Sequence, residues 1–69
     1  MKEIINMLRS IRVKNITVKS LEEISFRYGN RIYVLKIHEF NITITDKKLT
    51  FNFSRDRDVV ELIRDFLSM

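Results

Sequence analysis

Few residues of this 69-residue sequence carry side chains that catalyse reactions or bind metals. His38 is the only histidine, and cysteine is absent, which excludes a thiolate nucleophile, a disulfide and a cysteine-bound metal. Asp56 and Asp58 form a spaced carboxylate pair, but they precede a helical pattern, where acidic residues cap a helix and complement its dipole. Gly29 is the only glycine, so there is no glycine-rich phosphate loop. We therefore expect no enzyme, no cofactor, no metal site and no small-molecule substrate, and we interpret His38 as an exposed turn residue.

Lysine and arginine offer the remaining chemistry. The sequence has 13 of these cations against 9 Asp and Glu, with a formal net charge of +4. Residues 1–36 hold eight cations and three acidic residues, whereas the rest of the chain is nearly neutral. An asymmetry of this kind indicates an anionic partner such as nucleic acid. The residues that we expect to contact a phosphate backbone are Arg9, Arg12, Lys14, Lys19, Arg27, Lys36 and Lys48.

Short strands must position most of these cations. Apolar and polar residues alternate with period two through the middle of the chain, which is the pattern of half-buried strands. The strands are expected over residues 24–28, 31–37, 40–44 and 49–53. A fifth, edge strand is expected within residues 12–19, where the composition is also typical of strands.

Tight two-residue turns would join the four central strands. Gly29-Asn30 is the strongest hairpin signal because both residues tolerate positive φ, and His38-Glu39 and Asp46-Lys47 are weaker signals. With these turns, Leu35 would pair with Ile42. All three turns place the apolar residues on the same face of the sheet, although a slip of one residue would turn a whole strand's apolar set outward. Their agreement predicts an antiparallel β-meander.

Amphipathic helices are expected at both ends. Residues 2–11 carry an apolar stripe at helical spacing, and a second stripe begins near Val59, after a capping-box pattern at Asp58 and Glu61. Two helices, each about 10 Å across, would cover a five-stranded sheet about 20–24 Å wide. The predicted fold is therefore α+β: one small domain spanning residues 1–69, an antiparallel four- to five-stranded β-meander with both helices packed on one face.

The other sheet face would then be open to a partner. Alternation places mainly Lys, Arg, Thr and Asn there, which suits phosphate and sugar oxygens and equally suits a solvated surface. All strand aromatics have the parity of the core, so the stacking of bases on this face is not expected. The first hypothesis is therefore a small basic module that contacts the backbone of a nucleic-acid duplex, a folded RNA or a ribonucleoprotein.

A protein–protein interface is the alternative hypothesis. Ile32 and Val34 form a small apolar spot at the centre of the open face, which would suit a homodimer or another protein partner. The edge strand over residues 48–53 could also pair with a second chain. An ordinary central strand would equally carry one or two outer apolar residues, so both interpretations stay open.

The remaining features concern location and origin. No apolar run is long enough to span a membrane, and the first residues lack the apolar core of a signal peptide, so a cytoplasmic location is expected. Short loops and many charged residues are typical of thermophilic proteins and equally of compact viral proteins.

The order of helix, strands and helix is similar in outline to the Alu-RNA-binding proteins of the signal recognition particle and to some small ribosomal proteins. The resemblance lies in element order and in a basic sheet surface. It implies an RNA-binding role but assigns no residue to it.

Overall fold

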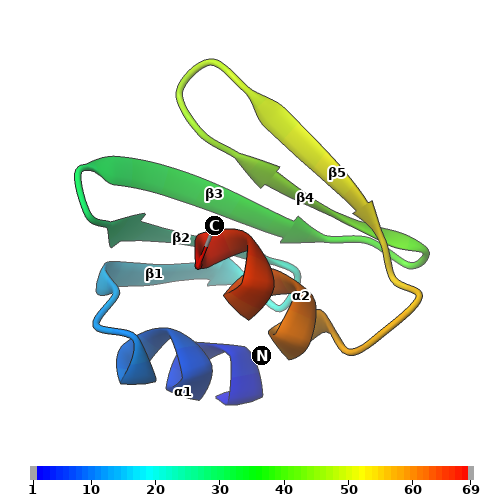
Figure 1. Cartoon of the computed structure of the whole chain (residues 1–69), viewed down its shortest axis with the longest axis horizontal. Coiled ribbons are helices and arrows are strands. Elements are labelled where there is room, and N and C mark those ends of the chain that lie inside the picture. Colours follow the sequence, from blue (N-terminus) through cyan, green and yellow to red (C-terminus); the bar gives the residue numbers. More distant parts are fainter. Residues whose placement is uncertain (1, 69) are drawn as a thin grey trace.

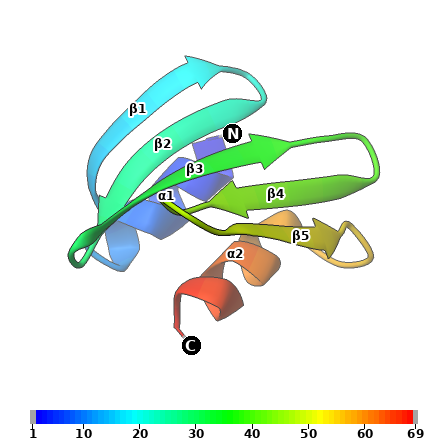
Figure 2. The same cartoon turned by 90° about the horizontal axis from the view of Figure 1, so that it is seen from above.

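The computed structural model describes residues 2–68, which form one small domain. Its elements are α1 (Lys2–Ser10), β1 (Lys14–Ser20), β2 (Glu23–Tyr28), β3 (Arg31–Ile37), β4 (Asn41–Thr45), β5 (Thr50–Ser54) and α2 (Val59–Leu67). The strands form one antiparallel sheet in the order β1-β2-β3-β4-β5 (Figure 1). Both helices lie on the same side of that sheet (Figure 2). The predicted α+β meander with a helix at each end is thus confirmed, and the fifth strand is present.

The core lies between the sheet and the two helices. Its fully buried side chains come from the middle strands and from one face of each helix: Leu8, Ile24, Phe26, Leu35, Ile42, Ile44 and Ile63. No polar or charged side chain is buried among the described residues. Each fully buried side chain of this size contributes about 1.5–3 kcal/mol relative to its exposed state. The apolar stripes of the helices are therefore used by the fold and are not available to a partner.

An aromatic cluster fixes α2 on the sheet. The ring of Phe66 lies 5.0 Å from that of Phe51, 5.7 Å from that of Phe53 and 5.9 Å from that of Tyr33, measured between centroids. Tilted and edge-to-face pairs of this kind each contribute about 0.5–1.5 kcal/mol beyond area burial. One helix residue thereby joins two strands that are not neighbours in the sheet.

The first hairpin turn is where the sequence predicts it. Ile24 pairs with Leu35 and Phe26 with Tyr33 across a two-residue turn at Gly29-Asn30. Gly29 has φ of 64°, whereas Asn30 is not among the residues with positive φ. Only the first of the two turn residues therefore has a positive φ. This is the pattern of a type II′ turn, which requires glycine at its first central position.

The other two hairpin turns lie one residue later than predicted. The amide of His38 donates to the carbonyl of Asn41 (2.8 Å), and the amide of Asp46 donates to that of Leu49 (2.9 Å). The turns are therefore Glu39-Phe40 and Lys47-Lys48. Each strand partner moves by two residues, so that Leu35 pairs with Ile44 rather than with Ile42. Because a shift of two preserves the side-chain alternation, the predicted core face is unchanged.

Local hydrogen bonds explain where these turns lie. The Asp46 carboxylate accepts from the amide of Lys47, which suits an aspartate at the first position of a β-turn. The Arg55 guanidinium donates to the carbonyl of His38 (2.9 Å) and holds the β3–β4 turn. As a result Phe40 and Leu49, expected in the core, are 79% and 55% exposed at the turns. Val18, also expected in the core, is 49% exposed on the edge strand β1.

Candidate nucleic-acid interface

Three chain connections meet at one end of the sheet. In an antiparallel meander, alternate turns lie at the same end of the strands. The α1–β1 connection, the β2–β3 turn and the β4–β5 turn therefore share one end of the strands; the first two are at the left of Figure 1 and the third, across the width of the sheet, is at its top. Residues that are far apart in sequence form one surface there.

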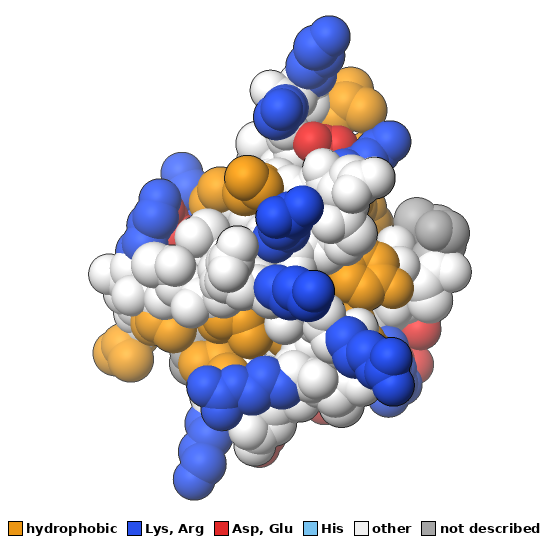
Figure 3. Space-filling model, turned by 90° about the vertical axis from the view of Figure 1, so that its left-hand side faces the viewer, with side chains coloured by type: hydrophobic (Ala, Val, Ile, Leu, Met, Phe, Trp, Pro, Cys, Tyr) orange, Lys and Arg blue, Asp and Glu red, His pale blue; other side chains and the backbone are white. Residues whose placement is uncertain are grey.

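This surface is strongly positive. We define the basic end as the cations in these connections and at the adjoining strand termini: Arg12, Lys14, Arg27, Arg31, Lys47 and Lys48. Asp46 is the only carboxylate in the same segments. Figure 3 views the molecule from this side and shows Lys and Arg side chains over much of it, with few acidic ones. The three-dimensional charge asymmetry is sharper than the difference between the two halves of the sequence.

Most of these cations have no anionic partner. Arg31 forms an ion pair with Asp46 at 3.1 Å, which neutralises one charge and ties the β4–β5 turn to β3. The other five form no salt bridge with any of residues 2–68. Arg12, Lys14 and Arg27 are also exposed. A surface with several unneutralised charges of one sign attracts polyanions over a distance of about a Debye length.

The end of α1 sets the position of Arg12. The amide of Val13 donates to the carbonyl of Leu8 (3.0 Å), and that of Arg12 donates to the carbonyl of Arg9 (3.1 Å). These two bonds are the Schellman pattern of a helix C-terminus. The pattern requires a left-handed residue, and Arg12 has φ of 64°. Arginine thus occupies a position that glycine adopts without steric cost.

An irregularity in β1 brings Lys14 beside Arg27. Lys14 pairs with Arg27, and Thr17 pairs with Ser25, so three steps along β1 face two steps along β2. Asn15, within this bulge, has φ of 56°, which asparagine tolerates better than most residues. Directly opposite residues project from the same face, so Lys14 and Arg27 carry their charges on the same side of the sheet.

A surface hollow of about 410 Å³ lies between these cations. Its lining residues are Arg12, Lys14, Arg27, Gly29 and Asn30. The Arg27 Nε donates to the carbonyl of Gly29 at 3.3 Å, which holds the guanidinium beside the turn. Arginine has five N–H donors, so the remaining four stay available to an anion. The hollow therefore has the donors of an anion site.

The seven sequence-predicted binding residues fall into two groups. Arg12, Lys14, Arg27 and Lys48 belong to the basic end, and Arg9 is exposed in the last turn of α1, which leads into it. Lys19 and Lys36 lie apart from it. Lys19 forms an ion pair with Glu23 at 3.6 Å, and Lys36 pairs with Glu23 in the β2–β3 ladder.

Two cations of the basic end escaped the sequence reasoning. Arg31 and Lys47 belong to it because their turns share one end of the sheet with the α1–β1 connection. The meander topology was itself predicted from the sequence. The predicted meander already implies that the α1–β1 connection, the β2–β3 turn and the β4–β5 turn share one end of the sheet. Arg31 and Lys47 could therefore have been assigned to this end from the sequence.

The open sheet face is polar along most of its length. Thr43 lies between Lys36 and Asn52 in one cross-strand row, and Val34 lies between Ser25 and Thr45 in the next. Ile32, the partner of Arg27, is 56% exposed, while Val34 is half-buried. Most of the exposed apolar surface at this spot therefore belongs to Ile32 alone.

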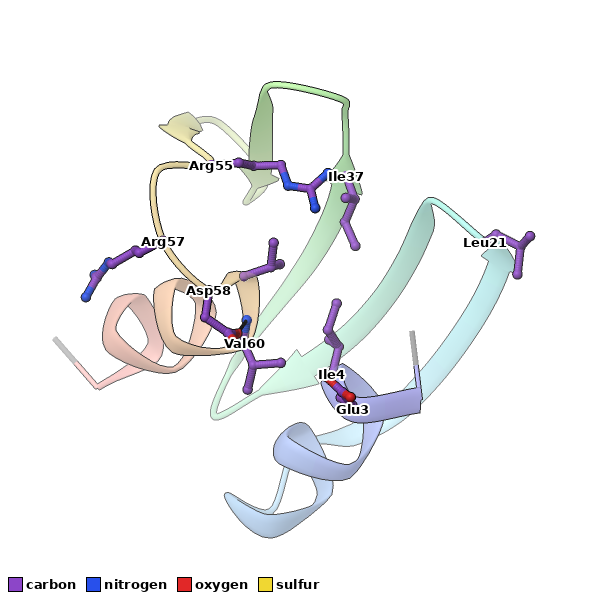
Figure 4. A pocket seen from close by; sticks show the side chains of 9 residues that line it. Glu3, Ile4, Leu21, Ile37, Arg55, Arg57, Asp58 and Val60 are labelled. Carbon is purple, nitrogen blue, oxygen red and sulfur yellow. Dashed lines mark hydrogen bonds between the residues drawn. The ribbon is translucent and has the colours of Figure 1, made fainter.

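The cations at the opposite end of the molecule serve the fold. A hollow of about 450 Å³ lies there between the N-terminal ends of the two helices, the β1–β2 turn and the end of β3 (Figure 4). Arg57, on its rim, forms ion pairs with Glu61 (3.0 Å) and Asp65 (2.9 Å). The Asp58 carboxylate caps α2 by accepting from the amide of Val60 at 2.8 Å. These charges are already partnered, unlike those of the basic end.

His38 and the acidic side chains are the remaining candidates for catalytic or metal chemistry. His38 lies exposed beside the β3–β4 turn, with Nε2 3.3 Å from the Thr43 hydroxyl. Among residues 2–68, no three His, Cys, Asp or Glu side chains are grouped so that they could hold a metal ion. No helix in the same range combines the length and the apolar character needed to cross a membrane.

Comparison with known proteins gives no relative: no protein-family model, curated protein or solved structure matches this chain. The similarity in outline to Alu-RNA-binding proteins therefore stays one of element order alone. Any functional assignment must come from the charges and geometry described above.

Proposed function

We propose that this protein is a small non-enzymatic module that binds the phosphate backbone of a nucleic acid, RNA or DNA, through its basic end. The observation that carries the proposal is a group of five cations, in or beside three separate connections at one end of the sheet, that form no salt bridge among the described residues. Lys and Arg supply most of the affinity of non-specific nucleic-acid binding through contacts with phosphates and the release of counterions.

The chemistry of the exposed surface favours backbone contact over the reading of bases. Among residues 2–68, no aromatic ring is offered for stacking at the basic end: Phe51, Phe53 and Tyr33 pack against Phe66, and the exposed ring of Phe40 lies at the β3–β4 turn, at the other end of the sheet. Stacking of bases on aromatic side chains is the usual basis of single-strand recognition by a sheet. We therefore propose a duplex or a folded RNA as the partner.

A salt titration tests this function. Binding to a short RNA or DNA duplex, followed by fluorescence anisotropy, should fall about 10²-fold between about 50 and 200 mM salt if four or five phosphates are contacted. A chain without measurable affinity at the lower salt concentration, or with affinity independent of salt, would refute the proposal.

Matched double variants locate the surface. Lys47→Gln with Lys48→Gln removes two charges from the basic end, and Lys19→Gln with Lys36→Gln removes two from elsewhere. We expect the first pair to weaken binding about 10-fold or more and to reduce the magnitude of the log–log salt slope by about two. The second pair should change affinity no more than about 2-fold. Equal losses for both pairs would mean that net charge, not the basic end, governs binding.

Ile32 supports one alternative function, a homodimer through the open face, because this apolar side chain is exposed near the start of β3. A two-fold interface centred there would bring Arg27 and Lys14 of one copy towards the same residues of the other. The repulsion between like charges opposes this arrangement, so we rank it second. Static light scattering of the wild type and of Ile32→Lys decides between one chain and a dimer.

A further inference from the structure

We propose that the hollow lined by Arg12, Lys14 and Arg27 binds a terminal phosphate, the phosphate monoester at the end of a nucleic-acid chain. The inference deepens the proposed function and depends on it, because it assigns one part of the basic end to one part of the ligand. The rest of the basic end would contact the internal phosphates.

Charge matching favours a monoester. Three cations line the hollow and no carboxylate does, whereas each of four other surface hollows includes at least one Asp or Glu. A phosphate monoester carries a charge of about −1.5 to −2 at pH 7, whereas an internal phosphodiester carries a single negative charge. A site with three cations gains most from the more highly charged group.

The donors are also arranged for a single anion. The Arg27 guanidinium is held at the β2–β3 turn by its bond to the Gly29 carbonyl, and Lys14 is its cross-strand partner. Paired residues in an antiparallel ladder have Cα atoms about 4.5–5.5 Å apart, so both head groups can reach one phosphate. A guanidinium offers two parallel N–H groups to two phosphate oxygens, and an ammonium adds a point charge.

The backbone at Arg12 provides an independent observation. Its φ of 64° lies in the region that side-chain-bearing residues rarely adopt, at a helix-terminal position where glycine is usual. A conformation with a steric cost at a position that lines a polar hollow indicates a role for the side chain. Here the role would be to supply the third positive charge.

The size of the hollow limits the ligand. A volume of about 410 Å³ is at the lower end of the range for small-molecule sites. It can hold a phosphate and the adjoining sugar, but not a stretch of duplex. The end of a chain fits this limit better than its middle.

Two RNA duplexes that differ only at their 5′ ends test the inference. One carries 5′-phosphates and the other 5′-hydroxyls, so internal backbone contacts are equal. We expect the wild-type protein to bind the phosphorylated duplex about 10-fold more tightly. Arg12→Gly should reduce this preference to less than about 2-fold while its Tm stays at or above that of the wild type. Arg64→Gln, which removes the same charge from an exposed position on α2, should retain the preference.

The outcomes separate the two proposals. Equal affinity for both duplexes would overturn the terminal-phosphate site and leave backbone binding in place. A preference that survives Arg12→Gly, or that Arg64→Gln abolishes equally, would also overturn it. If neither duplex binds at low salt, both proposals fall. Because Gly is compatible with the left-handed backbone at position 12, the decisive variant is expected to fold.

Discussion

At the scale of single residues, Arg12 is the most informative position. Its left-handed backbone conformation costs an L-residue about 1–2 kcal/mol relative to glycine. The conformation lets Val13 turn back towards Leu8, and both side chains are buried. The fold therefore needs the backbone angle at position 12 but not the arginine side chain, which is free to serve another purpose.

Replacing Arg12 should separate stability from binding. Arg12→Gly removes the steric cost but increases the entropy of the unfolded chain, so we expect the free energy of unfolding to rise by about 0.5–1 kcal/mol. Urea denaturation followed by circular dichroism measures the change. Asn15→Gly is the matched control, since asparagine tolerates its φ of 56° and the gain should be only a few tenths of a kcal/mol. A clear destabilisation by Arg12→Gly would show that the arginine side chain itself supports the fold.

At the scale of elements, α2 is held on the sheet by its buried aliphatic side chains and by the aromatic ring of Phe66. Phe66 contacts rings from β3 and β5, which do not pair with each other in the sheet. The central strands hold the buried aliphatic core, while this cluster joins the helix to the edge strand β5. Loss of the ring would weaken the attachment of both elements.

Two phenylalanine variants should therefore differ strongly. Phe66→Ala is expected to lower the free energy of unfolding by about 3 kcal/mol, through lost burial and lost ring contacts. Phe40→Ala should change it by less than about 0.5 kcal/mol, because Phe40 lies exposed in the β3–β4 turn. Chemical denaturation of both variants measures the difference. Equal losses would mean that the β3–β4 turn packs against the core and that the predicted turn at His38-Glu39 was right.

The element scale also shows how far sequence patterns reach. Alternation identified the central strands and assigned Ile24, Leu35, Ile42 and Ile44 correctly to the core face. It could not fix the second and third turns, because a turn moved by one residue shifts the partners by two and leaves the face unchanged. Phe40 and Leu49 were misplaced for this reason. The hydrogen bonds of Asp46 and Arg55, which settle the turns, involve side chains outside the alternating pattern.

At the scale of the whole molecule, charge is distributed by end rather than by face. The basic end holds five cations that form no salt bridge among residues 2–68, whereas Arg55 and Arg57 at the opposite end are bound to carbonyl or carboxylate oxygens. A molecule with this polarity would orient one end towards a polyanion, which raises the rate of association at low salt. The open sheet face between the two ends adds Thr and Asn, but few charges.

The oligomeric state follows from the same distribution. We expect static light scattering to give the mass of one chain even at high protein concentration, because a two-fold contact on the open face would place like charges together. Ile32→Lys should leave this mass and the fold unchanged, since Ile32 is largely exposed. A dimeric mass that returns to that of one chain in Ile32→Lys would instead support the interface hypothesis. Val34→Ala, at the neighbouring half-buried position, would serve as its control.

The sequence by itself determined the class of fold and the inward direction of the strand aromatics other than Phe40. These properties depend on the period of apolar residues and on capping, which are local and survive errors in strand register. The tertiary structure alone decided which cations lie together. Arg12, Arg27 and Lys48 are far apart in sequence, and only the pairing of strands brings their turns to one end. The left-handed conformation of Arg12 was likewise decided in three dimensions, because the chain must leave a packed helix and enter an edge strand at that residue.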